Sequence, residues 1–230
     1  MSKSFSDIEL YYTPDKNISK STIFLNHDEY KHAVKVMRNS IGSTIYITNG
    51  TGSIFKCEIV SIEPNKLTAT ILEKYNSENR LRNIFICIPK LKNPARFKFA
   101  LEKCAELGVV NFIIFESERT VSKGTNILRW EKILLSAMKQ SLNSFKPNIQ
   151  SINSIAEIAK LNGKKIIFEQ NSDQEFKFLN HSALDCYLIF GPEGGLTENE
   201  LNLFDNKVIY SLGDKRLRSE TAIVKVASML

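Results

Sequence analysis

Two short motifs near the end of the 230-residue chain decide how the rest of it is read. The first motif is LIFGPEGGLT at residues 188–197, and the second motif is LGDKRLRSETA at residues 212–222. Each begins as an apolar strand, passes into a glycine-containing loop and then opens a helix. Two such strand ends in succession predict a ligand site at one edge of a sheet.

The loop of the first motif favours a ligand without phosphate. Its glycines allow positive φ and let a ligand approach the main chain, and TENE at residues 197–200 is a capping box that starts a helix. No GxxxxGK[ST] or GxGxxG pattern occurs in the chain, and Glu193 places a carboxylate where a phosphate would sit. A neutral or cationic ligand fits better, although a plain glycine turn is the simpler alternative for one isolated loop.

The second motif adds cations beside this loop. Lys215, Arg216 and Arg218 follow the strand end, and Ser219 or Thr221 is expected to cap the last helix. Arginines at such a place predict a pocket next to an anionic or carbonyl-bearing substrate. The alternative is that they face solvent.

The positive charge of the chain is concentrated in one segment. Lys and Arg number 9 against 9 Asp and Glu in residues 1–78, 13 against 5 in residues 79–150, and 9 against 11 in residues 151–230. The balances are therefore 0, +8 and −2, which add to the net charge of +6. A local basic surface is typical of proteins that bind nucleic acid, and a solvated face is the alternative.

Composition narrows the class of protein. Hydrophobic residues at 43% and charged residues at 24% are globular values, and no apolar run is long enough to span a bilayer. The N-terminal residues lack the apolar core of a signal peptide. Four scattered cysteines predict reduced core thiols in a cytoplasmic protein, and three dispersed histidines argue against a zinc site.

Periodicity predicts two domains, with a linker at about residues 75–80. The first domain is read as a small β-barrel with a short helix between residues 26 and 38; its expected strands span 43–49, 54–62 and 67–72. The second domain begins with a strand, a helix and a strand at residues 84–88, 95–107 and 109–115, which predicts α/β architecture with a mainly parallel sheet. Helices are expected at 128–143 and 154–161, and further strands at 165–169, 187–190 and 208–212.

The two motifs together resemble those of the ribosomal RNA small subunit methyltransferase E family, within the SPOUT superfamily. The resemblance extends to KCAELGV at 103–109, ERTV at 118–121 and RWEKI at 129–133, with HAVKVMR at 32–38 in the first domain. It therefore covers nearly the whole chain.

This resemblance implies a PUA-like RNA-binding β-barrel at residues 1–75 and a SPOUT methyltransferase domain with a trefoil knot at residues 76–230. It implies a cytoplasmic homodimer without metal or membrane attachment, which uses S-adenosylmethionine to methylate N3 of a uridine in small-subunit ribosomal RNA, with the assembled 30S-type subunit as the expected substrate. The expected cofactor contacts are Phe190, Gly191, Glu193, Gly194, Gly195, Leu212, Gly213, Leu217, Thr221 and Ala222. We expect Arg218 and then Arg119 to be catalytic, and Arg38, Lys90, Lys92, Arg96 and Lys123 to bind RNA.

Two departures concern basic residues. The family usually has arginines near its start, where this chain has ELYY at 9–12, and Gly-Arg after the Gln-Ser at 140–141, where it has LNSF. Both departures affect RNA contacts and leave the cofactor motifs intact. They keep two alternatives open, namely a methyltransferase with another RNA target and a non-catalytic RNA-binding protein of ribosome assembly.

Overall fold

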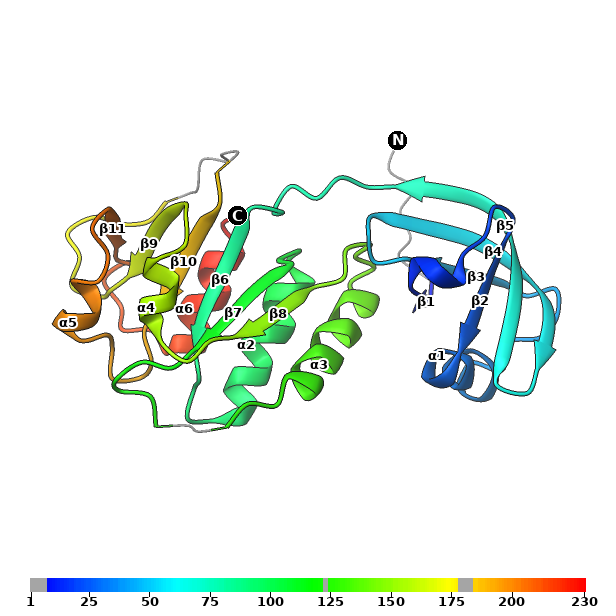
Figure 1. The fold of residues 1–230 in the computed structure, drawn as a ribbon, viewed down its shortest axis with the longest axis horizontal. Coiled ribbons are helices and arrows are strands. Elements are labelled where there is room, and N and C mark those ends of the chain that lie inside the picture. The colour runs from blue at the N-terminus through cyan, green and yellow to red at the C-terminus, as the bar shows by residue number, and fades with distance from the viewer. Residues whose placement is uncertain (1–7, 122–123, 178–183) are drawn as a thin grey trace. The chain divides into compact units, whose positions relative to one another are not determined.

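The computed structural model describes residues 8–121, 124–177 and 184–230, which form two compact units (Figure 1). The first unit comprises Met1–Asn79 and Met138–Lys146, and the second comprises Arg80–Ala137 and Pro147–Leu230. The sequence predicts a single linker at about 75–80. The sequence did not predict that residues 138–146 belong to the first unit.

The first unit is built on a five-stranded sheet in the order β1-β3-β4-β5-β2. Only β1 and β3 pair in parallel among its described strands. Just beyond β1, the hydroxyl of Thr13 donates to the carbonyl of Phe24 in β2 at 3.1 Å, so the two edge strands are joined around one apolar core. The strands are β1 (Leu10–Tyr12), β2 (Thr22–Asn26), β3 (Thr44–Thr48), β4 (Ser53–Glu63) and β5 (Lys66–Asn76).

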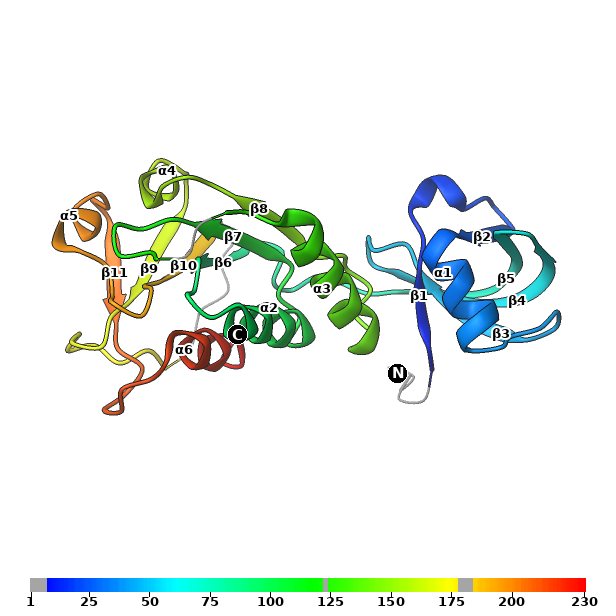
Figure 2. The ribbon, with the colours of Figure 1, turned by 90° about the horizontal axis from the view of Figure 1, so that it is seen from below.

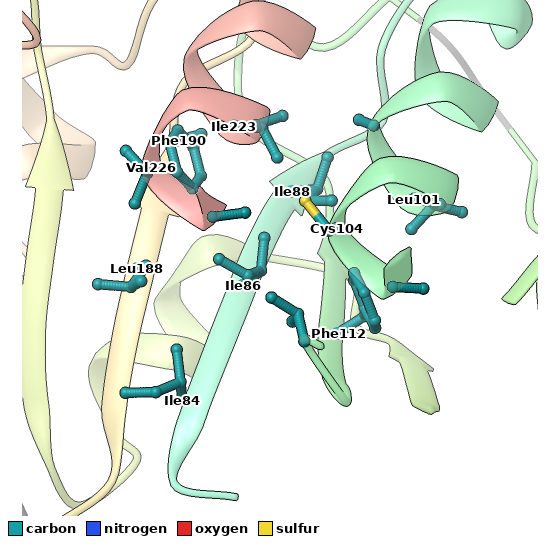
Figure 3. Packing of buried hydrophobic residues seen from close by; sticks show 14 of the residues in the cluster. Ile84, Ile86, Ile88, Leu101, Cys104, Phe112, Leu188, Phe190, Ile223 and Val226 are labelled. Carbon is teal, nitrogen blue, oxygen red and sulfur yellow. The ribbon is translucent and has the colours of Figure 1, made fainter. Parts of the chain in front are cut away.

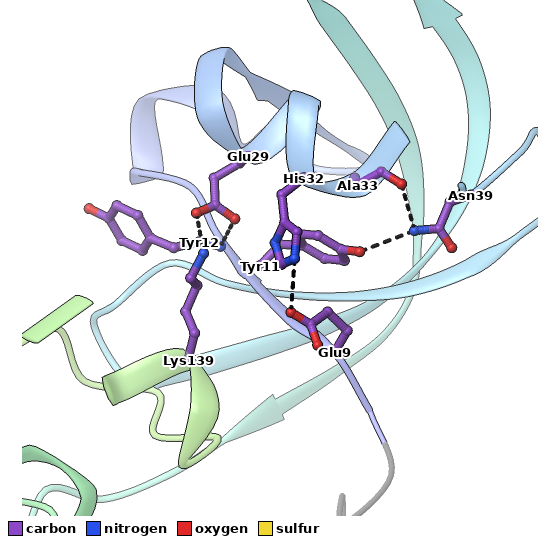
Figure 4. Close-up of polar contacts among 8 residues, drawn as sticks. All are labelled: Glu9, Tyr11, Tyr12, Glu29, His32, Ala33, Asn39 and Lys139. Atoms are coloured by element: carbon purple, nitrogen blue, oxygen red, sulfur yellow. Dashed lines mark hydrogen bonds and ion pairs between the residues drawn. The ribbon is translucent and has the colours of Figure 1, made fainter. Parts of the chain in front are cut away.

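Helical turns in the first unit are shorter than predicted. The single helix expected between residues 26 and 38 is instead α1 (His27–Lys31) followed by the π-helical turn η2 (His32–Val36), and a 3-10 turn, η1, spans Asp15–Asn17. Glu29 of α1 accepts hydrogen bonds from the Tyr12 main chain at 3.2 Å and from Lys139 Nζ at 2.6 Å (Figure 4). The second bond ties the segment 138–146 to this unit.

The second unit contains a six-stranded sheet in the order β11-β9-β10-β6-β7-β8, and all five strand pairings are parallel. The predicted α/β architecture with a parallel sheet is therefore confirmed. Its strands are β6 (Ile84–Pro89), β7 (Asn111–Phe115), β8 (Asn148–Ser151), β9 (Lys164–Phe168), β10 (Cys186–Phe190) and β11 (Lys207–Tyr210).

Helices cover both faces of this sheet (Figure 2). Successive strand residues point to opposite faces, so Ile86 and Ile88 lie in one apolar core (Figure 3). Cys87, between them in the sequence, lies in the other core. The first core is covered by α2 (Pro94–Glu106), α3 (Ile127–Gln140) and α6 (Ser219–Ala227), and the second by α4 (Ile155–Ala159) and α5 (Glu198–Leu201).

Local signals in the sequence are confirmed at several helix ends. Both capping boxes form, at Ser154 and at Thr197, and Gly108 ends α2 with φ +94°. The four cysteines are buried free thiols, as expected, and burial raises the pKa of Cys186 to about 11. Three strands, β1, β2 and β8, were not predicted.

Candidate active site

The first motif forms a tight turn between β10 and α5. Gly195 has φ +71°, and its N–H donates to the Pro192 carbonyl at 2.9 Å. A Cβ on Gly191 would lie 3.1 Å from the Cα of Gly195, closer than ordinary side-chain contacts allow. Glycines at these positions therefore let the chain fold back on itself and leave main chain on the surface of the loop.

Neighbouring segments hold this turn in place. Arg119 Nη1 donates to the Gly194 carbonyl at 2.6 Å. The buried side chain of Glu200 accepts from the main-chain N–H of Thr197 at 2.9 Å, which closes the capping box, and from that of Glu118 at 2.9 Å. The loop after β7 and the first motif are thus joined by two separate hydrogen bonds.

The second motif leads from β11 to α6 and contacts the first directly. Gly213 has φ +101°, and Lys225 Nζ donates to the Leu212 carbonyl at 2.7 Å. The hydroxyl of Ser219 donates to the Gly191 carbonyl at 3.2 Å. The prediction that Ser219 or Thr221 caps the last helix is wrong: the N-cap is Arg218 and makes no side-chain cap, because Ser219 is used to join the two motifs.

The two motifs enclose a cavity of about 910 Å³ at the carboxyl ends of β9, β10 and β11. Nine of the ten expected cofactor contacts line it, and so does Arg218. Thr221 is exposed and Arg119 is bonded to Gly194, and neither lines the cavity. Lys215 and Arg216, which were expected beside a pocket, line it as well. The lining residues that sequence reasoning missed are Phe168, Glu169, Gln170, Asn171, Pro192 and Ser219.

Four of the missed residues, Phe168 to Asn171, lie at the end of β9 or directly after it. The sequence did contain a signal for these residues, because a buried strand was expected at 165–169. The carboxyl ends of parallel strands lie at the same edge of a sheet, so the residues after this strand could have been expected near the two motifs. What the sequence lacked was the strand order, which places β9 between β11 and β10.

The cationic side chains around the cavity differ in whether they have an acidic partner. Arg96 Nε lies 3.4 Å from Glu220 Oε1, and Lys215 Nζ lies 3.1 Å from Asp214. Among the described residues, no hydrogen bond or ion pair joins the side chains of Arg216 and Arg218 to another group. Two guanidinium groups are therefore available to a ligand on this side.

The residues expected to bind RNA fall into different environments. Lys90 is 6% exposed and lies 2.5 Å from Glu116, so its interpretation as an RNA contact is corrected: burial and the ion pair make it a structural residue. Arg38, in the first unit, and Lys92 are exposed, and Arg96 lines the cavity. Lys123 lies outside the described residues.

Comparison with known proteins agrees with this architecture. A model of an RNA methyltransferase domain matches residues 77–230, and a model of an RNA methyltransferase PUA domain matches residues 25–72. The chain belongs to this RNA methyltransferase family.

Individual relatives point to one group within the family. The chain is 30% identical over 223 residues to ribosomal RNA small subunit methyltransferase E of Buchnera aphidicola, with 90% of the chain and 86% of the relative covered. It is 28% identical over 221 residues to the Bacillus subtilis protein of the same name, with 87% and 86% covered. The expected resemblance to the methyltransferase E family is confirmed.

A solved structure has the same fold over nearly the whole chain. It is ribosomal RNA small subunit methyltransferase E from Neisseria gonorrhoeae bound to S-adenosyl methionine, with a TM-score of 0.85, 26% identity and coverage of 96% and 95% of the two chains. No helix in the described part of the present chain is long and apolar enough to cross a membrane.

Proposed function

We propose that the protein methylates N3 of a uridine in small-subunit ribosomal RNA, with S-adenosylmethionine as the methyl donor. The observation that carries this proposal is that the two family motifs form one strand-end cavity, with an arginine in its wall, Arg218, that has no side-chain partner among the described residues. The trefoil knot, the cytoplasmic homodimer and the assembled 30S-type subunit as substrate are part of the proposal, and the family resemblance supports them.

The residues of the cavity fit S-adenosylmethionine. The ligand carries no phosphate, and the first motif presents glycine main chain together with the exposed carboxylate of Glu193. The second motif presents Arg216, which can pair with the carboxylate of the methionyl part. When bound, the cofactor supplies a methyl group on a sulfonium sulfur, which leaves as a neutral thioether once the new carbon–nitrogen bond forms.

Arg218 is assigned the stabilisation of charge on the substrate. Uridine N3 lies on the Watson–Crick edge, so the base must be unpaired or extruded before it reaches the site. As the N3 proton leaves, negative charge develops on the two flanking carbonyl oxygens. A guanidinium held in the cavity wall offers planar, paired donors to such oxygens.

Arg119 is assigned a different role from the one predicted for it. Its guanidinium donates to the Gly194 carbonyl, and its aliphatic part lies against Gly194, where a Cβ would be 3.3 Å from Arg119 Cδ. We therefore propose that Arg119 positions the loop of the first motif and does not touch the substrate.

The function is tested by incubating the protein with S-adenosylmethionine and unmethylated small subunits, or with naked small-subunit RNA, and analysing the nucleosides by mass spectrometry. We expect 3-methyluridine at one site, with more product from assembled subunits. Another methylated nucleoside would indicate a different target, and RNA binding without methylation would indicate a non-catalytic assembly protein.

A further inference from the structure

Glu169 is the cavity residue for which the family motifs offer no role. It follows β9 directly, and its main-chain N–H donates to the Tyr210 carbonyl of β11 at 3.0 Å. Its carboxyl group is hydrogen-bonded by the main-chain N–H of Leu196, at the end of the loop of the first motif. Glu169 thus lies between the two motifs and contacts the segments that carry both.

One oxygen of this carboxyl group is unsatisfied. Oε1 is fully buried and has no hydrogen-bond partner, and in the described part of the chain it is the only buried side-chain nitrogen or oxygen in that state. Burial raises the pKa of the Glu169 carboxyl, while the Leu196 N–H and the charge of Arg119 oppose that rise. Because buried polar groups in native proteins nearly always have partners, an unmatched acceptor in a cavity wall is expected to be matched by the ligand.

Other carboxylates near the cavity are already engaged. Glu193 accepts from the Lys92 N–H at 3.3 Å, and Glu220 is paired with Arg96. Glu169 also directly follows the middle one of the three strands whose carboxyl ends border the cavity, since β9 lies between β11 and β10 in the sheet. In S-adenosylmethionine the group between the adenine and the methionyl part is the ribose, whose two hydroxyl groups are hydrogen-bond donors.

We propose that Glu169 recognises the ribose of the cofactor by accepting a hydrogen bond from one of its hydroxyl groups. This role rests on the proposed function, because it takes S-adenosylmethionine as the ligand. The terminal torsion of glutamate is soft, so the carboxyl group of this lining residue can turn an oxygen toward a ligand in the cavity. Glu169 is then a specificity-determining residue that favours ribonucleosides over deoxyribonucleosides.

The test measures binding by calorimetry and does not depend on methyl transfer. S-adenosylhomocysteine and its 2′-deoxy and 3′-deoxy analogues are titrated into the wild-type protein, Glu169→Gln and Glu175→Gln. The last variant is the matched control, because Glu175 is exposed, lies on the segment after β9 and does not line the cavity.

We expect removal of one hydroxyl group to weaken binding to the wild type and to Glu175→Gln roughly tenfold or more, as befits a hydrogen bond to a charged group. In Glu169→Gln the same removal is expected to cost less than about threefold, because the amide presents a donor where the carboxylate presented an acceptor.

Equal losses in all three proteins, or no loss for either analogue in the wild type, would overturn the role of Glu169. If Glu169→Gln folds poorly, the wild-type series alone can still overturn the role, because a wild type that tolerates both deoxy analogues does not recognise the ribose hydroxyl groups. A wild-type protein that binds neither S-adenosylmethionine nor S-adenosylhomocysteine would instead refute the proposed function, and this inference with it.

Discussion

The two motifs occupy the same edge of one sheet but are built in opposite ways. The loop of the first motif is held by its own turn, by Arg119, by Glu200 and by the contact between Leu196 and Glu169. The second motif is anchored at its ends, through Leu212 and Ser219, while Lys215, Arg216 and Arg218 between these anchors are exposed.

This difference separates two tasks within one cavity. The loop of the first motif must fit a ligand closely with its main chain. If this loop is already rigid before the ligand binds, binding costs less conformational entropy. Cations that must meet charge on a large RNA benefit from being unpaired and near the surface. We therefore expect changes in the loop of the first motif to affect cofactor binding and stability, and loss of the exposed Arg218 in the second motif to affect catalysis.

The largest effect is expected for Arg218→Ala. Loss of the guanidinium should reduce methyl transfer by roughly 100- to 1,000-fold, because one donor to developing charge is worth about 3–4 kcal/mol. Binding of S-adenosylhomocysteine should change by less than about threefold, since this arginine is assigned to the substrate. Transfer of a tritiated methyl group and calorimetry measure the two quantities, with the exposed Lys160→Ala as control. Unchanged turnover would remove Arg218 from the reaction.

A comparison of two glycines tests whether the first motif is a close-fitting wall. In Gly191→Val the new side chain meets main chain at 3.1–3.3 Å, and we expect cofactor affinity to fall about 100-fold. In Gly194→Val it meets the flexible side chain of Arg119 at 3.3 Å, so a fall of roughly tenfold is expected. Calorimetric titration with S-adenosylmethionine gives both values. Normal affinity in the two variants would mean that the loop does not form the wall of the pocket.

Glu200→Ala tests the anchoring of the first motif to the loop after β7. The substitution leaves the main-chain N–H groups of Thr197 and Glu118 without their acceptor, and should lower the free energy of unfolding by about 2–3 kcal/mol. Glu198→Ala, in the same helical turn but exposed, should change it by less than about 0.5 kcal/mol. Urea unfolding measures both variants, and equal values would contradict the anchoring role.

The smallest effect is expected in the pH dependence that Glu169 confers on stability. Its pKa is raised in the folded protein, so the folded state holds this proton more tightly than the unfolded state does. The carboxyl group therefore makes the fold less stable as the pH rises through its folded pKa, and makes no such contribution below its unfolded pKa. The stability of Glu169→Gln relative to the wild type should accordingly increase as the pH rises from about 4, near the ordinary pKa of a glutamate, as measured by urea unfolding. A difference that stays constant or falls over this range would contradict the raised pKa.

Features with local causes could be predicted from the sequence. The apolar run at 84–88 indicates a strand buried on both faces, and SIAE at 154–157 and TENE at 197–200 carry their caps within four residues. The strand NIQS at 148–151 has too little apolar periodicity to be recognised, and β1 has only three residues. Short edge strands of this kind form because a neighbouring strand provides hydrogen-bond partners, and the neighbouring strand cannot be identified from the sequence alone.

Features that depend on distant partners were missed or misread. Ser219 could be read as a cap because its nearest donors are local, whereas its partner, Gly191, is 28 residues away. Lys90 was counted with the surface charges because a count of charges holds no information on burial. Glu169 could not be assigned to the cavity until the sheet order placed β9 between the strands of the two motifs.

The assignment of Met138–Lys146 to the first unit has a consequence for dissecting the protein. The main chain passes between the units three times, after Asn79, after Ala137 and after Lys146. Within the first unit, the main chain of Gly52 donates to the Ser144 carbonyl at 3.0 Å, and that of Lys146 donates to the Gly50 carbonyl at 2.8 Å. A fragment that stops at residue 79 therefore lacks residues 138–146, which are part of the first unit. A fragment that starts at residue 80 contains these residues although they do not belong to the second unit. No single scission of the polypeptide yields both units whole, so a faithful two-piece version would need a permuted or grafted chain.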